Sequence, residues 1–256
     1  MLKFNKMKEL NLNGFKIFKF EKLENRKGIF CAVTTKKYKN ESKFNFLDYD
    51  VKKNNLFKRF SNSIGSKNYF YMRQSHTSNI FLLKDKDIYT KDNIDGVITD
   101  IENKLLIGFS ADCSLSLFYD SKNKALGLCH AGWRGAFLNI YSNMLKNMTL
   151  HFNTDKKDLF VGIGPFISEK NYEVKYEIIK KFEEIYGYKT AKKFYSKIKN
   201  EYFLSLRKIL SYQLKELGIK NYEFADLCTY KNNDLFYSYR KGDKGHFIMC
   251  AEIRAK

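Results

Sequence analysis

Residues 104–135 read KLLIGFSADCSLSLFYDSKNKALGLCHAGWRG, and this stretch decides the fold class. It contains three apolar runs rich in β-forming residues, at Lys104–Ser110, Leu115–Tyr119 and Ala125–Cys129. The apolar residues that follow, from Phe137 to Met148, recur at intervals of three and four, which is typical of one face of a helix. Strands followed directly by a helix indicate an α/β or α+β domain.

The rest of the chain continues the same mixture of strands and helices. The patterns predict five more strands, at Gly28–Thr35, Tyr69–Arg73, Leu159–Gly164, Tyr222–Leu227 and His246–Ile253. They predict two more helices, at Val174–Tyr186 and Leu204–Leu217, the second ending before a glycine suited to the position after a helix. The polar segment 36–68 allows no assignment. Because no repeat or Pro/Gly/Ser-rich linker divides the chain, we expect a single α/β (α+β mixed) domain over residues 1–256.

The charge of the chain is strongly positive but widely spread. Lys and Arg number 47 against 28 Asp and Glu, a formal net charge of +19. The cations run from Lys3 to Lys256 without forming a basic tail, so we do not expect nucleic-acid binding, which needs a clustered basic face. The charge would instead attract small anions such as phosphate.

The cysteines and the hydropathy suggest where the protein works. No apolar run approaches the ~18 residues of a membrane helix, and the lysine-rich N-terminus lacks the apolar core of a signal peptide. The five cysteines, Cys31, Cys113, Cys129, Cys228 and Cys250, are scattered and odd in number, which is typical of reduced thiols. We therefore expect a cytoplasmic protein with no membrane partner.

Four segments lie at the ends of predicted strands, where active-site loops usually lie in mixed α/β folds. They are Gln74–Ser78, Ser110–Cys113, His130–Gly135 and Gly162–Pro165. Three side chains in them, His76, Cys113 and His130, are of the types that zinc and copper prefer, and three ligands leave a fourth position open for water or substrate. Their separations of 37 and 17 residues match no local zinc motif.

The same residues allow other interpretations. Cys113 and His130 also suit a Cys-His hydrolase dyad. Taken alone, each residue type more often has a structural role, as a small buried thiol or a hydrogen-bonded imidazole. Cys129 precedes His130 on a predicted strand, so its side chain would point to the opposite face and into the core.

The hexad His130–Gly135 carries a second signal. Gly132 and Gly135 flank Trp133, the one tryptophan of the chain, and Arg134 stands where a helix is predicted to begin. Two glycines permit close backbone approach, and an arginine at a helix start is suited to binding an anion. The alternative is a packed turn in which the tryptophan fills the core.

Taken in order, the motifs of this chain resemble those of the YfiH family, also called the multicopper polyphenol oxidase (laccase) family. The resemblance covers about residues 30–253. It rests on Gln74-x-His76, Asp95-Gly96-x-Ile98-Thr99, Ala111-Asp112-Cys113, His130-Ala-Gly-Trp-Arg-Gly135, Gly164-Pro165-x-Ile167, Tyr172-Glu173-Val174 and Phe236-Tyr-Ser-Tyr-Arg240.

The resemblance implies a fold, an activity and a metal site. The fold would be a single α/β domain with central mixed β-sheets flanked by helices, related to a group of proteins classed as cysteine hydrolases. The activity would be phosphorolysis of adenosine, inosine, guanosine and methylthioadenosine, together with deamination of adenosine. The family's metal ligands correspond to His76, Cys113 and His130, with zinc as the metal and copper as the alternative.

Two other activities follow from the family's history. Members are linked to peptidoglycan editing, which would suit a Cys-His hydrolase acting on a cell-wall precursor, and older descriptions call them copper-dependent polyphenol oxidases. A multicopper cluster of the usual kind needs far more than the four histidines of this chain, so copper oxidation ranks last. A binding module without turnover is the non-enzymatic alternative.

We expect the following roles for a purine nucleoside phosphorylase and adenosine deaminase. Zinc-activated water would attack C6 of adenosine, while Arg134, Arg240 and backbone amides near Gly132 would hold phosphate. Asp112 would orient a ligand, move a proton or make a structural hydrogen bond, Ser75 would contact the ribose, and Glu173 is a weaker carboxylate candidate. The partners would be purine nucleosides and phosphate; the sequence does not determine the oligomeric state.

The chain departs from the family pattern at several positions. Ser114-Leu115 replaces Leu-Pro, Ser205 replaces an aspartate, and Lys244-Gly245-His246 replaces Thr-Gly-Arg. None removes a proposed metal ligand, but the departures at Ser205 and His246 bear on substrate range and phosphate binding.

Overall fold

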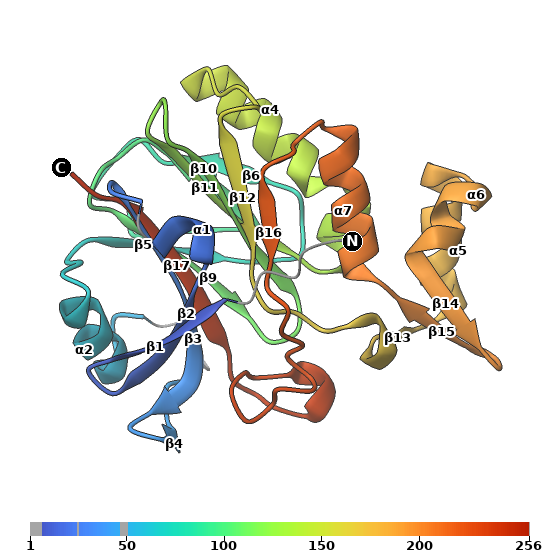
Figure 1. Ribbon diagram of the computed structural model, residues 1–256, viewed down its shortest axis with the longest axis horizontal. Coiled ribbons are helices and arrows are strands. Elements are labelled where there is room, and N and C mark those ends of the chain that lie inside the picture. The colour runs from blue at the N-terminus through green and yellow to red at the C-terminus, as the bar shows by residue number, and fades with distance from the viewer. Residues whose placement is uncertain (1–6, 25, 47–50, 256) are drawn as a thin grey trace.

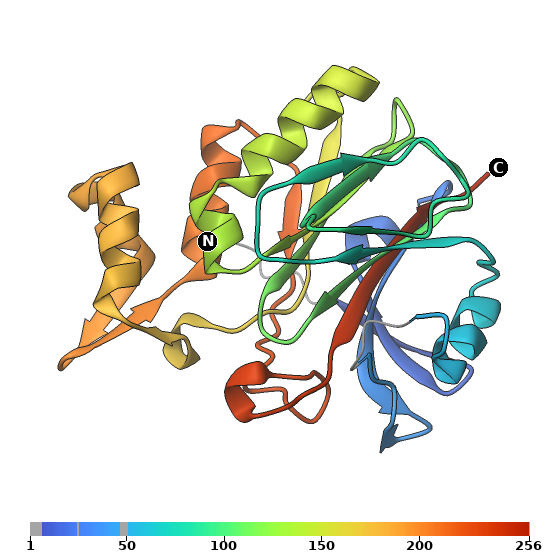
Figure 2. The same ribbon diagram turned by 180° about the vertical axis from the view of Figure 1, so that it is seen from behind.

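Two mixed β-sheets stacked face to face form the centre of the protein (Figures 1 and 2). The structure is a computed structural model that describes residues 7–24, 26–46 and 51–255. The space between the sheets is filled by apolar side chains from both, among them Val33, Leu106 and Met249 of the first sheet and Leu117 and Leu128 of the second. Burial of these two facing surfaces is the main favourable term in assembling the sandwich.

The first sheet has eight strands within the described residues. Its order is β1 (Lys8–Leu12), β2 (Phe15–Lys19), β3 (Ile29–Tyr38), β17 (Phe247–Ile253), β9 (Leu105–Ser110), β5 (Tyr69–Arg73) and β7 (Thr90–Asp92), with β4 (Glu41–Ser42) paired to β3. β5 runs parallel to β9 and β7, and the other pairs are antiparallel. Its outer face is covered by helix α2 (Asn55–Ser63), which buries Phe57 and Phe60 against Ile107 and Ile248.

The second sheet has six strands within the described residues. Its order is β16 (Tyr222–Phe224), β12 (Leu159–Ile163), β10 (Ser114–Asp120), β11 (Ala125–Ala131), β8 (Gly96–Thr99) and β6 (Ile80–Leu82). Three helices cover its outer face: α3 (Trp133–Phe137), α4 (Ile140–Phe152) and α7 (Leu206–Glu216). Cys129 lies in the core beneath these helices, which confirms its predicted orientation away from His130.

A smaller lobe projects from the sandwich beside α7, on the right in Figure 1 and the left in Figure 2. It consists of α5 (Tyr176–Tyr186), α6 (Tyr188–Ala191) and the sheet β13 (Glu173–Val174), β15 (Glu201–Leu204) and β14 (Tyr195–Ile198). Short helical turns lie at α1 (Glu21–Glu24), η1 (Glu169–Asn171), η2 (Lys192–Phe194) and η3 (Tyr239–Lys241).

The mixed α/β architecture confirms the predicted fold class, and all eight predicted strands are present. The helix predicted from Phe137 onward is wrong in one respect, because the chain breaks at Asn139, whose left-handed φ of 51° separates α3 from α4. The Asn139 side chain accepts a hydrogen bond from Ser142 N and so starts a new helix. The unassigned segment 36–68 contains β4 and α2, while residues 47–50 lie outside the described part of the chain.

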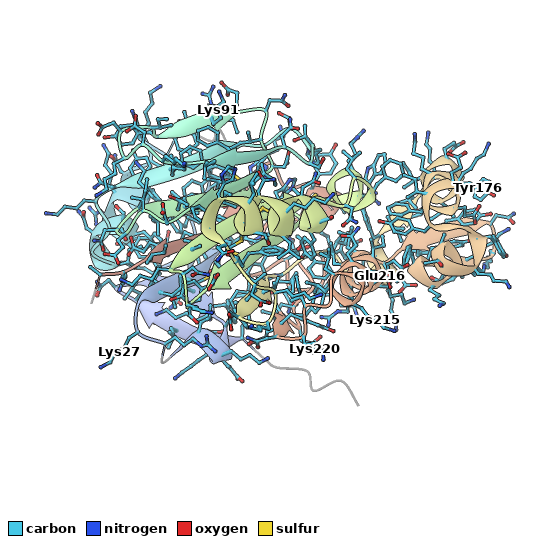
Figure 3. All side chains as sticks on the ribbon, turned by 90° about the horizontal axis from the view of Figure 1, so that it is seen from above. Lys27, Lys91, Tyr176, Lys215, Glu216 and Lys220 are labelled. Carbon is cyan, nitrogen blue, oxygen red and sulfur yellow. The ribbon has the colours of Figure 1, made fainter. Side chains whose placement is uncertain are left out.

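The surface charge is spread over separate faces of the molecule. Figure 3 shows Lys27, Lys91, Lys215 and Lys220 reaching outward from different places on the surface. Their separation matches the scatter of cations along the chain. In the part of the chain that the structure describes, no helix has both the length and the apolar character that a membrane span requires.

Candidate metal centre

Three of the four segments singled out in the sequence meet at the end of the sandwich where the long loop between β16 and β17 lies, at the bottom of Figure 1; Gly162–Pro165 does not line this site. Gln74 and His76 follow β5, the 111–113 turn joins β9 to β10, and His130 lies near the end of β11. Pairing of β5 with β9 and of β10 with β11 brings these strand ends together, so the positions follow from the sheet topology.

His76, Cys113 and His130 converge. Their ligand atoms all lie within 4.8 Å of one another, and His76 Nε2 is 4.0 Å from Cys113 Sγ. The two imidazole rings are nearly perpendicular, with centroids 5.0 Å apart. Zinc bonds of ~2.0–2.3 Å in a tetrahedral arrangement place ligand atoms about 3.3–3.6 Å apart, so a modest contraction of the group would hold an ion.

Asp95 fixes two of these residues at once. Its carboxylate is completely buried and lies 2.8 Å from His130 Nδ1, which leaves His130 Nε2 to face the other two side chains. It also accepts hydrogen bonds from the backbone N–H groups of Ser75, His76 and Thr77. A carboxylate behind a histidine ligand sets the ring's orientation and basicity, as at many metal sites.

The backbone conformation at two positions, His76 and Gly132, shapes the site. His76 has a positive φ of 58°, a conformation held in place by the hydrogen bonds to Asp95. A Cβ added to Gly132 would lie 2.7 Å from Cys113 Sγ and 3.4 Å from His76 Cδ2. Gly132 therefore permits the hexad to pass directly beside the two ligands.

The electrostatics of the site favour an ionised thiol. Burial raises the pKa of Cys113, but the positive charge of His130 and hydrogen bonds from His130 and His76 outweigh burial and lower it to about 6. Burial lowers the pKa of His130, but the negative charges of the Cys113 thiolate and Asp95 have the larger effect and raise this pKa to about 9. Without metal the pair is thus a thiolate beside an imidazolium. A metal would use the same thiolate and displace the imidazolium proton.

These three side chains lie in the wall of a cavity of 810 Å³. Its wall also contains Trp133, Arg134, Tyr172, Arg240 and His246. The Arg134 guanidinium lies over the Trp133 ring at 4.6 Å, and that of Arg240 over the Tyr172 ring at 5.0 Å. Neither guanidinium has a carboxylate partner within the described residues, so both remain available to an anion.

The other predicted site residues lie as follows. Gly132 and Asp112 line the cavity, but the Asp112 carboxylate is occupied by Thr229, Ser238 and the Arg240 backbone. Ser75 and Glu173 do not line it; Ser75 is exposed beside His76, and Glu173 is exposed in β13.

The two departures from the family pattern are placed differently. Ser205 lies outside the cavity and caps α7, accepting a hydrogen bond from Lys208 N. His246 lines the cavity, and its Nδ1 lies 3.1 Å from the Phe46 carbonyl oxygen. Only the second departure therefore bears directly on ligand binding.

Two residues of the site were missed as functional by reasoning from the sequence. Asp95 appeared only within a family motif, and its place before the apolar run Gly96–Thr99 does not by itself indicate that the carboxylate is buried. Tyr172 is a buried phenol on the cavity wall beneath Arg240. No local pattern distinguishes it from the other tyrosines of this tyrosine-rich chain.

Known proteins resemble this chain in sequence over most of its length. The family model described as "Multi-copper polyphenol oxidoreductase laccase" matches residues 42–254. A purine nucleoside phosphorylase of Staphylococcus epidermidis is 37% identical over 159 residues, 60% of this chain and 58% of that protein. The purine nucleoside phosphorylase YlmD of Staphylococcus aureus is 31% identical over 194 residues, 71% of this chain and 72% of that protein.

Solved structures show the same fold. The Bacillus licheniformis hypothetical protein YfiH superimposes with a TM-score of 0.83 at 24% identity, covering 98% of this chain and all of that one. YlmD from Geobacillus stearothermophilus gives a TM-score of 0.83 at 20% identity, covering 96% of this chain and 98% of that one.

Proposed function

Because this chain belongs to the multi-copper polyphenol oxidoreductase laccase family, we propose that it is a zinc-dependent enzyme that cleaves purine nucleosides with phosphate. The observation that carries the proposal is the convergence of His76, Cys113 and His130 in the wall of a cavity that also holds two guanidinium groups, neither with a carboxylate partner among the described residues. The purine nucleoside phosphorylases among its relatives supply the reaction class.

The cavity residues account for the binding of phosphate. Arg134 and Arg240 are both exposed, both preorganised by an aromatic ring and both without an acidic partner among the described residues. Planar guanidinium groups bind phosphate oxygens in pairs. They would orient one phosphate oxygen toward C1′ of the nucleoside. As the new C1′–O bond forms, the C1′–N9 bond breaks, and its electron pair leaves with the purine, which takes up a proton.

The metal would be held by His76 Nε2, Cys113 Sγ and His130 Nε2. Two imidazoles and a thiolate suit zinc, whereas the four histidines of the chain are too few for a multicopper cluster. When bound, zinc would supply a Lewis acid and lower the pKa of a bound water, the chemistry needed for deamination of adenosine at C6. Asp95 would keep the His130 ring oriented and its Nδ1 proton engaged.

A Cys-His hydrolase is the second candidate, favoured by the metal-free electrostatics of the site. Cys113, His130 and Asp95 follow one another as nucleophile, base and orienting carboxylate, and the pKa of Cys113 is lowered to about 6. That order of groups is the one that activates a thiol in cysteine hydrolases. Such an enzyme, acting on a cell-wall precursor, would keep its activity without metal and lose it on alkylation of the thiol.

The test incubates the purified protein with adenosine, with and without phosphate, and separates adenine, inosine and hypoxanthine by chromatography. We expect phosphate-dependent release of adenine and formation of inosine, both abolished in Cys113→Ala and after chelation. Base release that survives complete metal removal would contradict the zinc proposal. Absence of any purine product from metal-loaded protein would contradict purine chemistry and direct the assay to cell-wall precursors.

A further inference from the structure

The loop between β16 and β17, residues 225–246, is attached to the metal-ligand turn by one buried carboxylate, that of Asp112. We call this segment the Arg240 loop. Asp112 Oδ1 accepts a hydrogen bond from Thr229 Oγ1 at 2.6 Å. Asp112 Oδ2 accepts one from Ser238 Oγ at 3.0 Å and one from the backbone N–H of Arg240 at 2.8 Å. The carboxylate is 5% exposed, and the two hydroxyl-bearing residues are completely buried.

The position of Asp112 in the chain is what makes these contacts informative. It directly precedes Cys113, yet the three donors come from residues more than a hundred positions away. Its own carbonyl oxygen accepts a hydrogen bond from Ile167 N, so its backbone is held as well. Asp112 has a φ of 102°, a conformation that costs energy for a residue other than glycine. A residue with a strained backbone, whose buried carboxylate accepts three hydrogen bonds from one distant loop, is suited to holding that loop in place.

The Arg240 side chain is fixed separately. Its guanidinium lies 5.0 Å from the centroid of the buried Tyr172 ring. The backbone of Arg240 is thus held by Asp112 and its side chain by Tyr172. Together these contacts set the guanidinium at one place relative to Cys113, although no hydrogen bond joins Arg240 to Cys113 in the described structure.

We propose that Asp112 is a positioning residue that fixes Arg240 relative to the metal ligand Cys113 and thereby builds the anion subsite of the cavity. This inference rests on the proposed function, because it assigns phosphate to Arg240. It replaces a role for Asp112 in proton transfer: all three of its contacts hold the Arg240 loop.

The experiment uses the full chain with inorganic phosphate as the probe, and measures the phosphate Kd by calorimetry in the wild type, four test variants and one control variant. Asp112→Gly removes the carboxylate at a backbone conformation that glycine adopts freely, so loss of binding would not reflect backbone strain. Asp112→Asn keeps an oxygen acceptor for the Arg240 N–H and serves as the rescue. Arg240→Ala and the double variant Asp112→Gly/Arg240→Ala complete a cycle.

Asp120→Ala is the matched control. Asp120 lies at the other end of β10, is completely buried and accepts three hydrogen bonds, from Lys122 N, Asn123 N and Asn123 Nδ2. Asp120→Ala should lower the thermal stability by an amount similar to Asp112→Gly, without changing the phosphate Kd. A weakening of phosphate binding in this control equal to that in Asp112→Gly would overturn the proposal.

We expect Asp112→Gly to raise the phosphate Kd about tenfold or more, the order expected when a hydrogen bond to a charged group is lost. Asp112→Asn should recover most of the lost phosphate affinity. In the Arg240→Ala background, adding Asp112→Gly should not raise the phosphate Kd further. A Kd within twofold of wild type in Asp112→Gly, or fully additive losses in the double variant, would overturn the proposal.

Hydrogen exchange of the segment 238–241 separates this inference from the proposed function. If wild-type protein binds no phosphate, the proposed function fails, but faster exchange of the Arg240 amide in Asp112→Gly would still support the positioning role. Unchanged exchange in that variant would overturn it.

Discussion

Replacing Gly132 by alanine should weaken metal binding while leaving the metal-free protein folded. Gly132 has a φ of −80°, which any residue adopts, so the substitution introduces no backbone strain. Its only obstacle is space, because the new Cβ would lie 2.7 Å from Cys113 Sγ and 3.4 Å from His76 Cδ2. The substitution should therefore displace two proposed ligands, Cys113 and His76, and leave His130 in place.

The size of the effect follows from those distances. Non-bonded carbon contacts are favourable at about 3.5–4.0 Å, so the Cys113 sulfur would have to move by roughly 1 Å. Metal–ligand distances tolerate only about ±0.2 Å. We expect a loss in zinc affinity of about 10–100-fold, the range seen when a residue supporting a metal ligand is removed. This corresponds to about 1.4–2.7 kcal/mol of binding free energy.

The assay is competition for zinc against a chromophoric chelator, with thermal unfolding of the chelator-treated protein measured in parallel. Gly135→Ala is the matched control in the same hexad, because its Cβ would meet only the His130 and Thr77 carbonyl oxygens, at 3.3 and 3.5 Å, and the Ala131 Cβ at 3.8 Å. It should bind zinc with an affinity close to that of the wild type. If Gly132→Ala also bound zinc within twofold of wild type, Cys113 would not be a ligand in the arrangement described here.

Three further predictions concern Asp95 and Cys113 at the site and Tyr141 in the core. Asp95→Ala should reduce zinc affinity by about 10–100-fold and destabilise the metal-free protein by about 3–5 kcal/mol, because buried donors including His130 lose their acceptor; chelator competition and urea unfolding measure the two effects. In chelator-treated protein, the rate of iodoacetamide labelling of Cys113 should rise with pH about a midpoint near 6, because only the thiolate reacts. Cys31, whose pKa is raised to about 12 by burial, should stay unlabelled up to pH 9. Peptide mass spectrometry measures the labelling of both residues. Tyr141→Phe should cost about 1 kcal/mol of unfolding free energy by deleting the buried 2.6 Å hydrogen bond to Ser116, and should leave the zinc Kd unchanged.

The sequence predicted the central strands well because the sandwich buries them on both faces. Runs such as Tyr69–Arg73 and Lys104–Ser110 have continuous apolar centres, and that continuity locates the strands to within a residue. The edge strand β1 and its neighbour β2 mix apolar residues with charged ones, so the same criterion does not find them. The break at Asn139 was also hidden, because the helical spacing of apolar residues continues across it.

The site could be predicted only in part, for a related reason. β10 and β11 form a hairpin whose register pairs Leu115 with His130, so the proximity of Cys113 to the hexad follows from a local turn. His76 joins them through the parallel pairing of β5 with β9 and through Asp95, both of which link segments far apart in the chain. The role of Asp112 depends on the Arg240 loop, whose path has no local sequence signature.

X-ray absorption at the zinc edge of the metal-loaded protein tests the metal centre most directly, with Cys113→Ser as the comparison. We expect one sulfur at about 2.3 Å, two imidazole nitrogens at about 2.0–2.1 Å and one further light atom in the open position. The sulfur contribution should disappear in Cys113→Ser. A zinc shell without sulfur in the wild-type protein, or one that is unchanged in the variant, would contradict the assignment of His76, Cys113 and His130 as the metal ligands.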